Sequence, residues 1–326
     1  GNVFMSKFTI DKSHFITGEL LMKHKIILDT DPGIDDAVMI STALTDPQLD
    51  VALITTVAGN VTVDKTTKNA LKLVDFFNKD VPVAAGATDP LIKKFEDAAR
   101  IHGESGMAGY DFPEPTSKPL TLHAVQALHE TLKNSAEPIT LITTGAYTNI
   151  ALLLREYPEI KPKIKQIIAM GGSLGRGNMT SAAEFNVFTD PHAAQIMYSS
   201  QIPLVMVGLD VTLAGRISDE TTAKLKQFGR AGQMLHDIIG HDFDHDEKGT
   251  AIHDLQTLFY LEHPEAFETK DYWIDIVTEG PAVGETVADI RGAYHDGKTN
   301  AKVCVGIDTV AFNQWLLDKV SQNMQN

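Results

Sequence analysis

The feature that most constrains the fold is a regular alternation, from Lys25 onward, of short apolar runs with longer segments of helical periodicity. The apolar runs, such as KIILDT and VALITTVA, are rich in β-branched residues and end at turn signals, which predicts strands. The segments between them, such as 34–44 and 65–77, repeat their apolar residues with the period of a helix. This alternation is typical of a parallel sheet built from βαβ units.

The same alternation returns after an irregular stretch, residues 88–119, that is rich in Gly and Pro. Its strands and helices are predicted, in chain order, at ITLITTG, NIALLLREY, IKQIIAMGG, PHAAQIMYSS and IPLVMVGLD. From about Lys270 the chain is expected to add further strands and a closing helix. The strands are apolar without interruption, so we expect helices on both faces of the sheet. The predicted fold is α/β, a mostly parallel central sheet flanked by helices with a Rossmann-like core, in a single domain.

Charge and composition exclude several classes of partner. The chain has 28 basic and 43 acidic side chains, a formal net charge of −15 at pH 7, which argues against binding nucleic acid or an anionic membrane surface. No apolar run approaches the roughly 20 residues that span a bilayer. The single cysteine, Cys304, lies in an apolar run and is expected to be a buried thiol, as a reducing compartment permits. We therefore expect a cytoplasmic protein with a small-molecule partner.

The first residues do not follow the pattern of the rest. Residues 1–21 show no clear periodicity, and charged and polar residues interrupt what would be the apolar core of a signal peptide. Met22 would make a natural start. We therefore interpret residues 1–21 as an N-terminal extension or a cloning remnant, and residues 22–326 as the domain.

Four aspartates crowd the end of the first predicted strand: Asp29, Asp31, Asp35 and Asp36 lie within eight positions. Asp31 is predicted to N-cap the following helix, with Pro32 in its first position. The helix dipole would account for one or two acidic residues there. It does not account for four, because like charges this close repel and raise one another's pKa. A bound cation resolves the conflict, and an all-oxygen ligand set favours Ca²⁺ or Mg²⁺ over zinc.

The stretch DTDPGIDDA, residues 29–37, resembles the N-terminal signature of the inosine-uridine-preferring nucleoside hydrolases, which are Ca²⁺-dependent N-ribohydrolases. Later stretches match the family in the expected order: TTVAGN, HGESGM, TTGAYTNIA, AMGG, AEFN and HDL. The resemblance is strongest to bacterial ribonucleoside hydrolases that accept purine and pyrimidine ribosides. It implies calcium-dependent hydrolysis of nucleosides such as uridine and inosine to ribose and free base, in nucleoside salvage. It also implies a homo-oligomer, either a tetramer or a dimer.

The resemblance also implies roles for individual residues. Asp31, Asp36, Asp254 and the backbone carbonyl of Thr144 match the calcium ligands, and Asp31 also matches the base that activates water. The positions that match substrate-binding residues are Asp35, Asn60, Met170, Glu184, Asn186 and Asp254. Taken alone, several of these residues have ordinary structural explanations, since Asn60 suits a turn, Met170 a core and Asp254 a helix cap.

Two histidines match residues near the leaving base. His253 corresponds to the leaving-group acid of the family, and His102 to a second histidine that faces the substrate. The segment before His253 departs from the family, because Phe243 stands where relatives often carry a tyrosine. His241 and His245 could join the acid network, although a solvated, flexible loop is the simpler interpretation. A tryptophan at the His253 position marks the purine-specific subgroup, so its absence favours activity on both uridine and inosine.

Two rival functions stay open at this level. A strand that ends in Asp-x-Asp also opens the haloacid-dehalogenase-type phosphatases, although these usually continue toward Gly-Thr instead of Pro-Gly. A non-catalytic ribonucleoside-binding protein could use the same site without releasing ribose.

Overall fold

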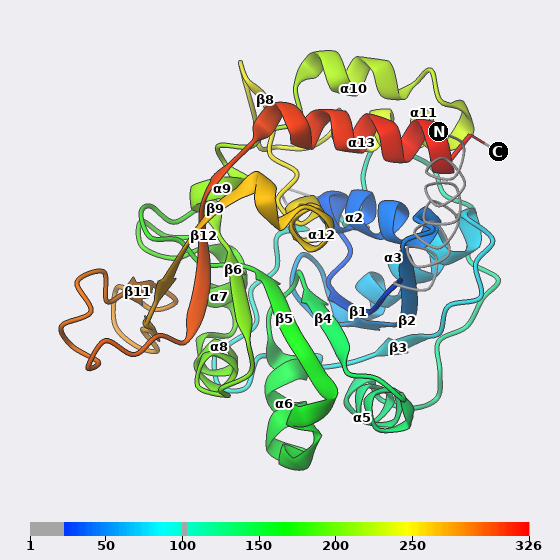
Figure 1. Ribbon diagram of the computed structural model, residues 1–326. Helices are drawn as coiled ribbons and strands as arrows, with labels where there is room; N and C mark the ends of the chain where they lie inside the picture. The colour runs from blue at the N-terminus through cyan, green and yellow to red at the C-terminus, as the bar shows by residue number, and fades with distance from the viewer. Residues whose placement is uncertain (1–22, 100–102, 326) are drawn as a thin grey trace, which may run out of the picture.

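The computed structural model describes residues 23–99 and 103–325. The predictions for His102 and for residues 1–21 fall outside these ranges. Within them, the main sheet has eight strands in the order β3-β2-β1-β4-β5-β6-β12-β9 (Figure 1). The strands are β1 (His24–Thr30), β2 (Leu49–Thr56), β3 (Val83–Ala85), β4 (Ile139–Thr143), β5 (Ile164–Met170), β6 (Leu204–Val207), β9 (Phe267–Tyr272) and β12 (Ala301–Ile307). All neighbouring strands pair in parallel except β12 and β9, which are antiparallel. The predicted mostly parallel sheet is confirmed.

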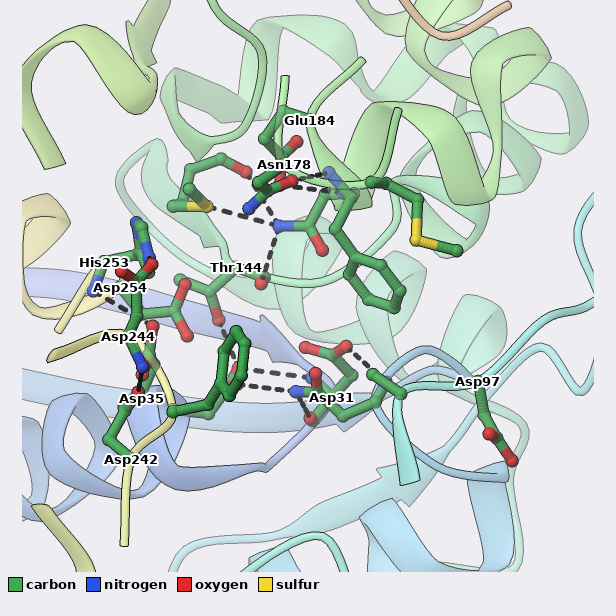
Figure 2. A pocket seen from close by; sticks show the side chains of 18 residues that line it. Asp31, Asp35, Asp97, Thr144, Asn178, Glu184, Asp242, Asp244, His253 and Asp254 are labelled. Atoms are coloured by element: carbon green, nitrogen blue, oxygen red, sulfur yellow. Dashed lines mark hydrogen bonds and ion pairs between the residues drawn. The ribbon is translucent and has the colours of Figure 1, made fainter. Parts of the chain in front are cut away.

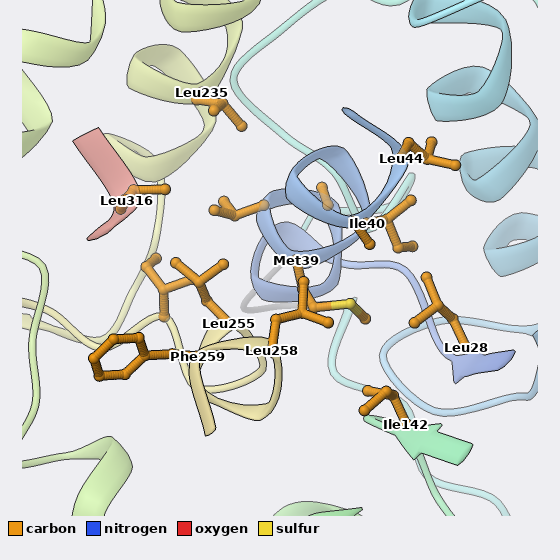
Figure 3. Close-up of a cluster of buried hydrophobic side chains, with 14 of the residues drawn as sticks. Leu28, Met39, Ile40, Leu44, Ile142, Leu235, Leu255, Leu258, Phe259 and Leu316 are labelled. Atoms are coloured by element: carbon orange, nitrogen blue, oxygen red, sulfur yellow. The ribbon is translucent and has the colours of Figure 1, made fainter. Parts of the chain in front are cut away.

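Helices cover both faces of this sheet. Alternate side chains of each strand point to opposite faces, and since both sets are apolar, both faces must be buried. In β1, Ile26 and Leu28 join one hydrophobic cluster and Ile27 joins the other. The first cluster is completed by α2 (Ile34–Thr45), α3 (Val63–Phe76), α10 (Asp219–Leu225), α11 (Gly229–Ile239), α12 (Leu255–Glu262) and α13 (Thr309–Asn323). The second is completed by α5 (Ala124–Asn134), α6 (Thr148–Glu156) and α8 (Pro191–Tyr198). Figure 3 shows Met39 of α2 near Leu258 of α12 in the first cluster.

The smaller elements lie around this core. They are α7 (Phe185–Thr189), α9 (Leu209–Thr212), η1 (Pro158–Lys163), η2 (Pro264–Ala266), the hairpin of β7 (His245–Asp246) and β8 (Gly249–Thr250), and the hairpin of β10 (Ile274–Ile276) and β11 (Thr286–Ala288). Cys304 is buried in β12, as predicted. Across the described ranges, no helix combines the length and the apolar character needed to cross a membrane.

The order of the strands creates one place for a ligand. From β1 the sheet continues through β2 and β3 on one side and through β4, β5 and β6 on the other. The backbone N–H of Thr144, just after β4, donates to the carbonyl of Asp29 at 2.9 Å, so the ends of β1 and β4 lie together. Ligands of open α/β sheets bind where the strand order reverses in this way.

A buried ion-pair network anchors the C-terminal helix α13. Lys319 Nζ lies 2.9 Å from Asp46 Oδ2 and 2.7 Å from Glu262 Oε1, and the two carboxylate side chains are 0% and 1% exposed. Burial, together with the neighbouring Asp46, raises the pKa of Glu262 to about 7. The network therefore places one cation against two carboxyl groups that have almost no access to water.

We expect Lys319→Met to lower the free energy of unfolding by about 3–5 kcal/mol, because two buried carboxyl groups lose their cation. The loss should be smaller at pH 5 than at pH 8. The pKa of Glu262 lies at about 7 in the folded protein against an ordinary value of 4.5, so folding takes up a proton between these values. The contribution of Glu262 to stability is therefore present at low pH and is lost as pH rises through 7.

Urea unfolding of both proteins at pH 5 and pH 8 measures this effect. Lys302→Met is the matched control, because Lys302 pairs with Asp271 at the surface, at 3.7 Å. That pair is screened by solvent, and its loss should change stability by no more than about 0.5 kcal/mol. Similar losses in the two variants, or a larger loss at pH 5 for Lys319→Met, would contradict the prediction.

Candidate active site

A pocket opens at the carboxyl ends of β1 and β4, where the strand order reverses (Figure 2). Its lining includes every predicted site residue that lies in the described ranges: Asp31, Asp35, Asp36, Asn60, Thr144, Met170, Glu184, Asn186, His253 and Asp254. These residues come from segments up to 223 positions apart (254 − 31). The fold therefore brings together in one pocket the site residues that the sequence predicted individually.

Asp31 does not cap α2, so that prediction is wrong. The helix begins at Ile34 with Gly33 as its N-cap, and the Gly33 N–H is directed at Asp36 Oδ2, 3.4 Å away. Asp31 Oδ2 instead accepts the backbone N–H of Asn60 at 2.9 Å, while Asn60 Nδ2 donates to the Asp31 carbonyl at 2.8 Å. The loop after β2 therefore holds the Asp31 carboxylate, which makes no capping hydrogen bond to α2.

The second oxygen of Asp31 is the chemically informative one. Asp31 Oδ1 is buried, and it has no hydrogen-bond partner among the described residues. The loop at Gly59 approaches so closely that a Cβ there would lie 2.1 Å from Asp31 Oδ2, which explains the glycine before Asn60. Burial, followed by the charge of Asp36, raises the pKa of Asp31 well above its usual range. The site thus holds a carboxylate oxygen directed at something other than protein.

Asp36 and Asp254 meet across the pocket. Asp36 Oδ1 accepts the hydroxyl of Thr144 at 2.7 Å, and the Asp36 and Asp254 carboxyl groups lie close enough for each to perturb the pKa of the other. Asp254 stands at the N-cap position of α12, but its side chain makes no capping hydrogen bond to the described backbone. Burial and then the charge of Asp36 raise the pKa of Asp254 well above its usual range. A helix-cap role therefore does not account for Asp254.

The oxygen atoms in this part of the pocket suit a hard divalent cation. In residues 23–99 and 103–325, no three His, Cys, Asp or Glu side chains are arranged as a formed metal centre. Three carboxylates and the Thr144 carbonyl nevertheless line one pocket, and Asp31 Oδ1 is unpartnered there. Oxygen donors of this kind are the ligands that Ca²⁺ and Mg²⁺ prefer. The residues present therefore fit such an ion.

Glu184 and Asn186 are held rigidly on the opposite wall. Glu184 caps α7, with its carboxylate accepting the backbone N–H groups of Gly172 at 3.0 Å and Asn186 at 2.8 Å. Asn186 Nδ2 donates to the carbonyls of Thr144 at 3.0 Å and Met170 at 3.1 Å. Burial raises the pKa of Glu184, although its backbone hydrogen bonds oppose the rise. The sequence did not reveal this second, structural duty of Glu184.

His253 lies where the pocket meets the loop before β7. Its backbone N–H donates to Asp35 Oδ2 at 3.0 Å, which ties the start of α2 to the start of α12. Its ring nitrogens are both engaged, Nδ1 with Thr212 Oγ1 at 2.7 Å and Nε2 with Asp244 Oδ2 at 2.9 Å. Burial, and then the nearby Asp242, raises the pKa of Asp35 well above its usual range.

The loop over His253 is exposed to solvent at His241, Phe243 and His245, in line with the predicted solvated loop, but part of it also lines the pocket. Asp242, Phe243 and Asp244 line the pocket. His241 bonds the carbonyl of Asp237 and His245 bonds Asp219, and neither is among the residues that line the pocket. Sequence reasoning missed the two aspartates.

A signal for these aspartates was present in the sequence. Asp242 and Asp244 are two positions apart, a spacing that places side chains on one side of an extended segment. A further set of lining residues was also missed: Asp97, Ala98, Asn178, Met179 and Phe185. The sequence around this set contains no comparable pattern.

Comparisons with known proteins agree with this geometry. Residues 26–314 match the family described as inosine-uridine preferring nucleoside hydrolase. The non-specific ribonucleoside hydrolase RihC of Escherichia coli O7:K1 is 46% identical over 299 residues, which cover 91% of this chain and 98% of the relative. RihC of Salmonella typhimurium is 46% identical over 295 residues, covering 90% and 96%.

Solved structures give the same result. A purine-preferring ribonucleoside hydrolase from Gardnerella vaginalis has a TM-score of 0.84 at 30% identity, covering 91% of this chain and 98% of that one. The plant nucleoside hydrolase PpNRh1 has a TM-score of 0.85 at 28% identity, covering 91% and 99%. The predicted fold and family are confirmed, and a match over most of the chain leaves the phosphatase alternative without support. The chain belongs to the inosine-uridine preferring nucleoside hydrolase family and is an N-glycosyl hydrolase.

Proposed function

We propose that this protein hydrolyses the N-glycosidic bond of both purine and pyrimidine ribonucleosides, such as inosine and uridine, to ribose and free base. The observation that carries the proposal is the convergence of Asp31, Asp36 and Asp254 with His253 in one pocket. The relatives named as non-specific support a broad range of bases. Phe243 also supports it, because this pocket residue offers an aromatic face and no hydrogen-bonding group to distinguish one base from another.

We propose Ca²⁺ as the cofactor, held by Asp31, Asp36, Asp254 and the backbone carbonyl of Thr144. The family is generally metal-dependent, and the oxygen ligands favour a hard cation. When bound, the ion would help to keep the attacking water and the sugar hydroxyls in register.

The protein groups divide the remaining work. Asp31 accepts the proton of the water through Oδ1, while the Asn60 N–H holds its other oxygen and so fixes the direction of the carboxylate. The water oxygen bonds to the anomeric carbon as the C–N bond breaks, and the electron pair of that bond leaves with the base. His253 supplies the proton that the departing base needs.

The ribose is proposed to lie among the buried polar residues of the pocket. Asp35, Asn60, Glu184 and Asn186 bind its hydroxyls, and Met170 lies beneath the ring. Buried carboxylates in these positions place negative charge near the cationic transition state, where low polarity strengthens the interaction.

Several wider features are proposed only by resemblance to the family. These are a role in nucleoside salvage, assembly as a homodimer or homotetramer, and a cytoplasmic location. His102, outside the described ranges, remains the proposed second histidine near the substrate.

Release of reducing sugar from a panel of purine and pyrimidine ribonucleosides and deoxyribonucleosides tests the function. We expect turnover of inosine and uridine. Calcium-dependent binding of nucleosides without release of ribose would instead identify a non-catalytic binding protein and contradict the proposal.

Removal of calcium is a separate test. We expect one tightly held Ca²⁺ per chain, because three carboxyl groups otherwise repel one another in a buried site. Exhaustive chelation should abolish activity and lower the melting temperature, since an ion present at about 100 times its Kd stabilises a protein by about 2.7 kcal/mol. Asp254→Asn should mimic part of both losses. Full turnover after removal of the metal, verified by elemental analysis, would rule out the cofactor.

A further inference from the structure

The ring of His253 is held from both sides. Thr212 Oγ1 contacts Nδ1 and Asp244 Oδ2 contacts Nε2, and the His253 side chain is only 11% exposed. A departing base can therefore use the imidazole only in the orientation that these two partners impose. Asp244 also lines the pocket, so it is the partner on the side of the substrate.

Asp244 is in turn fixed by a buried arginine. Arg216 donates from Nη1 to the Asp244 carbonyl at 2.9 Å and to the Gly249 carbonyl at 3.3 Å, and its Nη2 lies 3.4 Å from Asp244 Oδ1. Its Nε lies 3.2 Å from Asp246 Oδ2 and donates to the carbonyl of Leu213 at 3.0 Å. One guanidinium thus spans the whole loop that carries Asp244.

The backbone of this loop is also tied to its surroundings. The β7–β8 hairpin closes it, and Thr250 pairs with Ile217. Gly249 has a φ of +127°, and a Cβ there would lie 2.1 Å from the Ile217 carbonyl oxygen, so only glycine allows this approach. The Arg216 contacts and the backbone pairing of the loop therefore hold the Asp244 carboxylate against His253.

The charge of Asp244 requires Nε2 of His253 to be a hydrogen-bond donor. Burial opposes ionisation, but the hydrogen bond from His253, the positive charge of that ring and then the charge of Arg216 hold the pKa of Asp244 below its usual value. An ionised carboxylate only accepts hydrogen bonds, so Nε2 must be the donor in this pair. Thr212 can donate or accept, and it therefore imposes no choice of its own on Nδ1.

We propose that Asp244, anchored by Arg216, is a positioning residue for the leaving-group step. It orients the His253 imidazolium with Nε2–H toward the pocket; the departing base then takes this proton in place of Asp244, and the hydrogen on Nδ1 stays with Thr212. This inference rests on the proposed function, in which His253 serves the departing base.

Kinetics on two classes of substrate test the proposal. Asp244→Ala should lower kcat on inosine and uridine by about tenfold to a hundredfold, the range for losing a residue that orients a functional imidazole. Turnover of p-nitrophenyl β-D-riboside, whose leaving group needs no proton, should fall much less. Asp244→Asn, which keeps an acceptor oxygen for Nε2–H, should recover part of the lost rate.

Asp246→Ala is the matched control. Asp246 bonds the same Arg216 in the same loop, and no contact among the described residues joins it to His253. This variant should keep the ratio of natural to activated substrate rates. Equal losses on both substrates for Asp244→Ala, or the same profile in the two variants, would show that Asp244 acts only by supporting the fold and would overturn the proposal.

A spectroscopic readout separates this proposal from the proposed function. In the NMR spectrum, the Nε2–H proton of His253, assigned with ¹⁵N-histidine, should resonate downfield through its bond to the carboxylate. The signal should be retained in Asp246→Ala and lost in Asp244→Ala. A signal unchanged by Asp244→Ala would overturn the proposal whether or not the enzyme is active. Absence of ribose release by the wild-type protein would overturn the proposed function alone.

Discussion

Asp31→Asn is expected to lower kcat on inosine and uridine by at least about 10² to 10⁴, the contribution of a positioned general base. The substitution preserves the size of the side chain and one oxygen, so the hydrogen bond from the Asn60 N–H can persist. It removes the basic Oδ1, which in the folded protein is buried and unpartnered among the described residues. Binding of nucleoside should weaken less than kcat, because the sugar contacts elsewhere in the pocket remain.

Steady-state kinetics and a binding measurement with the same nucleoside separate these two effects. Asp29→Asn is a useful comparison, because Asp29 is also buried after the same strand but bonds Thr55 at 2.6 Å and Asn149 at 2.8 Å. That change should act mainly on stability. An Asp31→Asn enzyme within about tenfold of the wild-type kcat would exclude Asp31 as the base.

His253→Ala should lose kcat on inosine and uridine by about 10² to 10⁴, because their bases leave poorly without a proton. Most of the rate on p-nitrophenyl β-D-riboside should be retained, since its leaving group departs as a stable anion. The hydrogen bond to Asp35 comes from the backbone N–H of residue 253, so the substitution does not remove it.

Asp31→Asn supplies the control for this experiment, because loss of water activation should slow both classes of substrate alike. If His253→Ala slows natural and activated substrates equally, His253 acts through structure or through its neighbour Asp254. The acid would then have to be sought at His102 or among the loop residues 240–249.

Much of the fold could be predicted because its strands carry their own signal. Residues 26–28 of β1 are apolar without alternation, and the structure buries them against helices on both faces. The helix predicted at 34–44 is found at Ile34–Thr45, and the one predicted at 65–77 at Val63–Phe76. Their boundaries shifted by one or two residues, since capping depends on neighbours that the local pattern does not include.

The cap of α2 shows where local reasoning fails. Aspartate is a good N-cap, and Pro32 suits a first helical position, so a helix starting after Asp31 was a sound prediction. The backbone N–H of Asn60, in the loop after β2, hydrogen-bonds the Asp31 carboxylate instead of the N–H groups of the helix. That partner is 29 positions away, and no property of residues 29–37 reveals it.

The loop before His253 is a second place where the local sequence does not reveal a contact with a distant residue. Its composition, with Asp242, Asp244 and two histidines, reads as a solvated surface segment. Arg216, 28 positions before Asp244, bonds the loop at Asp244 and Asp246, and so holds part of an otherwise exposed stretch in the wall of the pocket. A buried arginine contact of this kind is decided by tertiary packing alone.

The sequence by itself determined the class of fold, the family and the chemical types of the site residues, because these depend on periodicity and on motifs of a few adjacent residues. Only the tertiary structure decided which oxygen of Asp31 is unpartnered among the described residues, that Asp254 lines the pocket without capping its helix, and that Asp244 holds His253. The physical reason is that each of these side chains can bond alternative partners, some of them far away in the chain. The free energies of such contacts depend on distance and burial, which exist only once the strands are paired and the helices are packed.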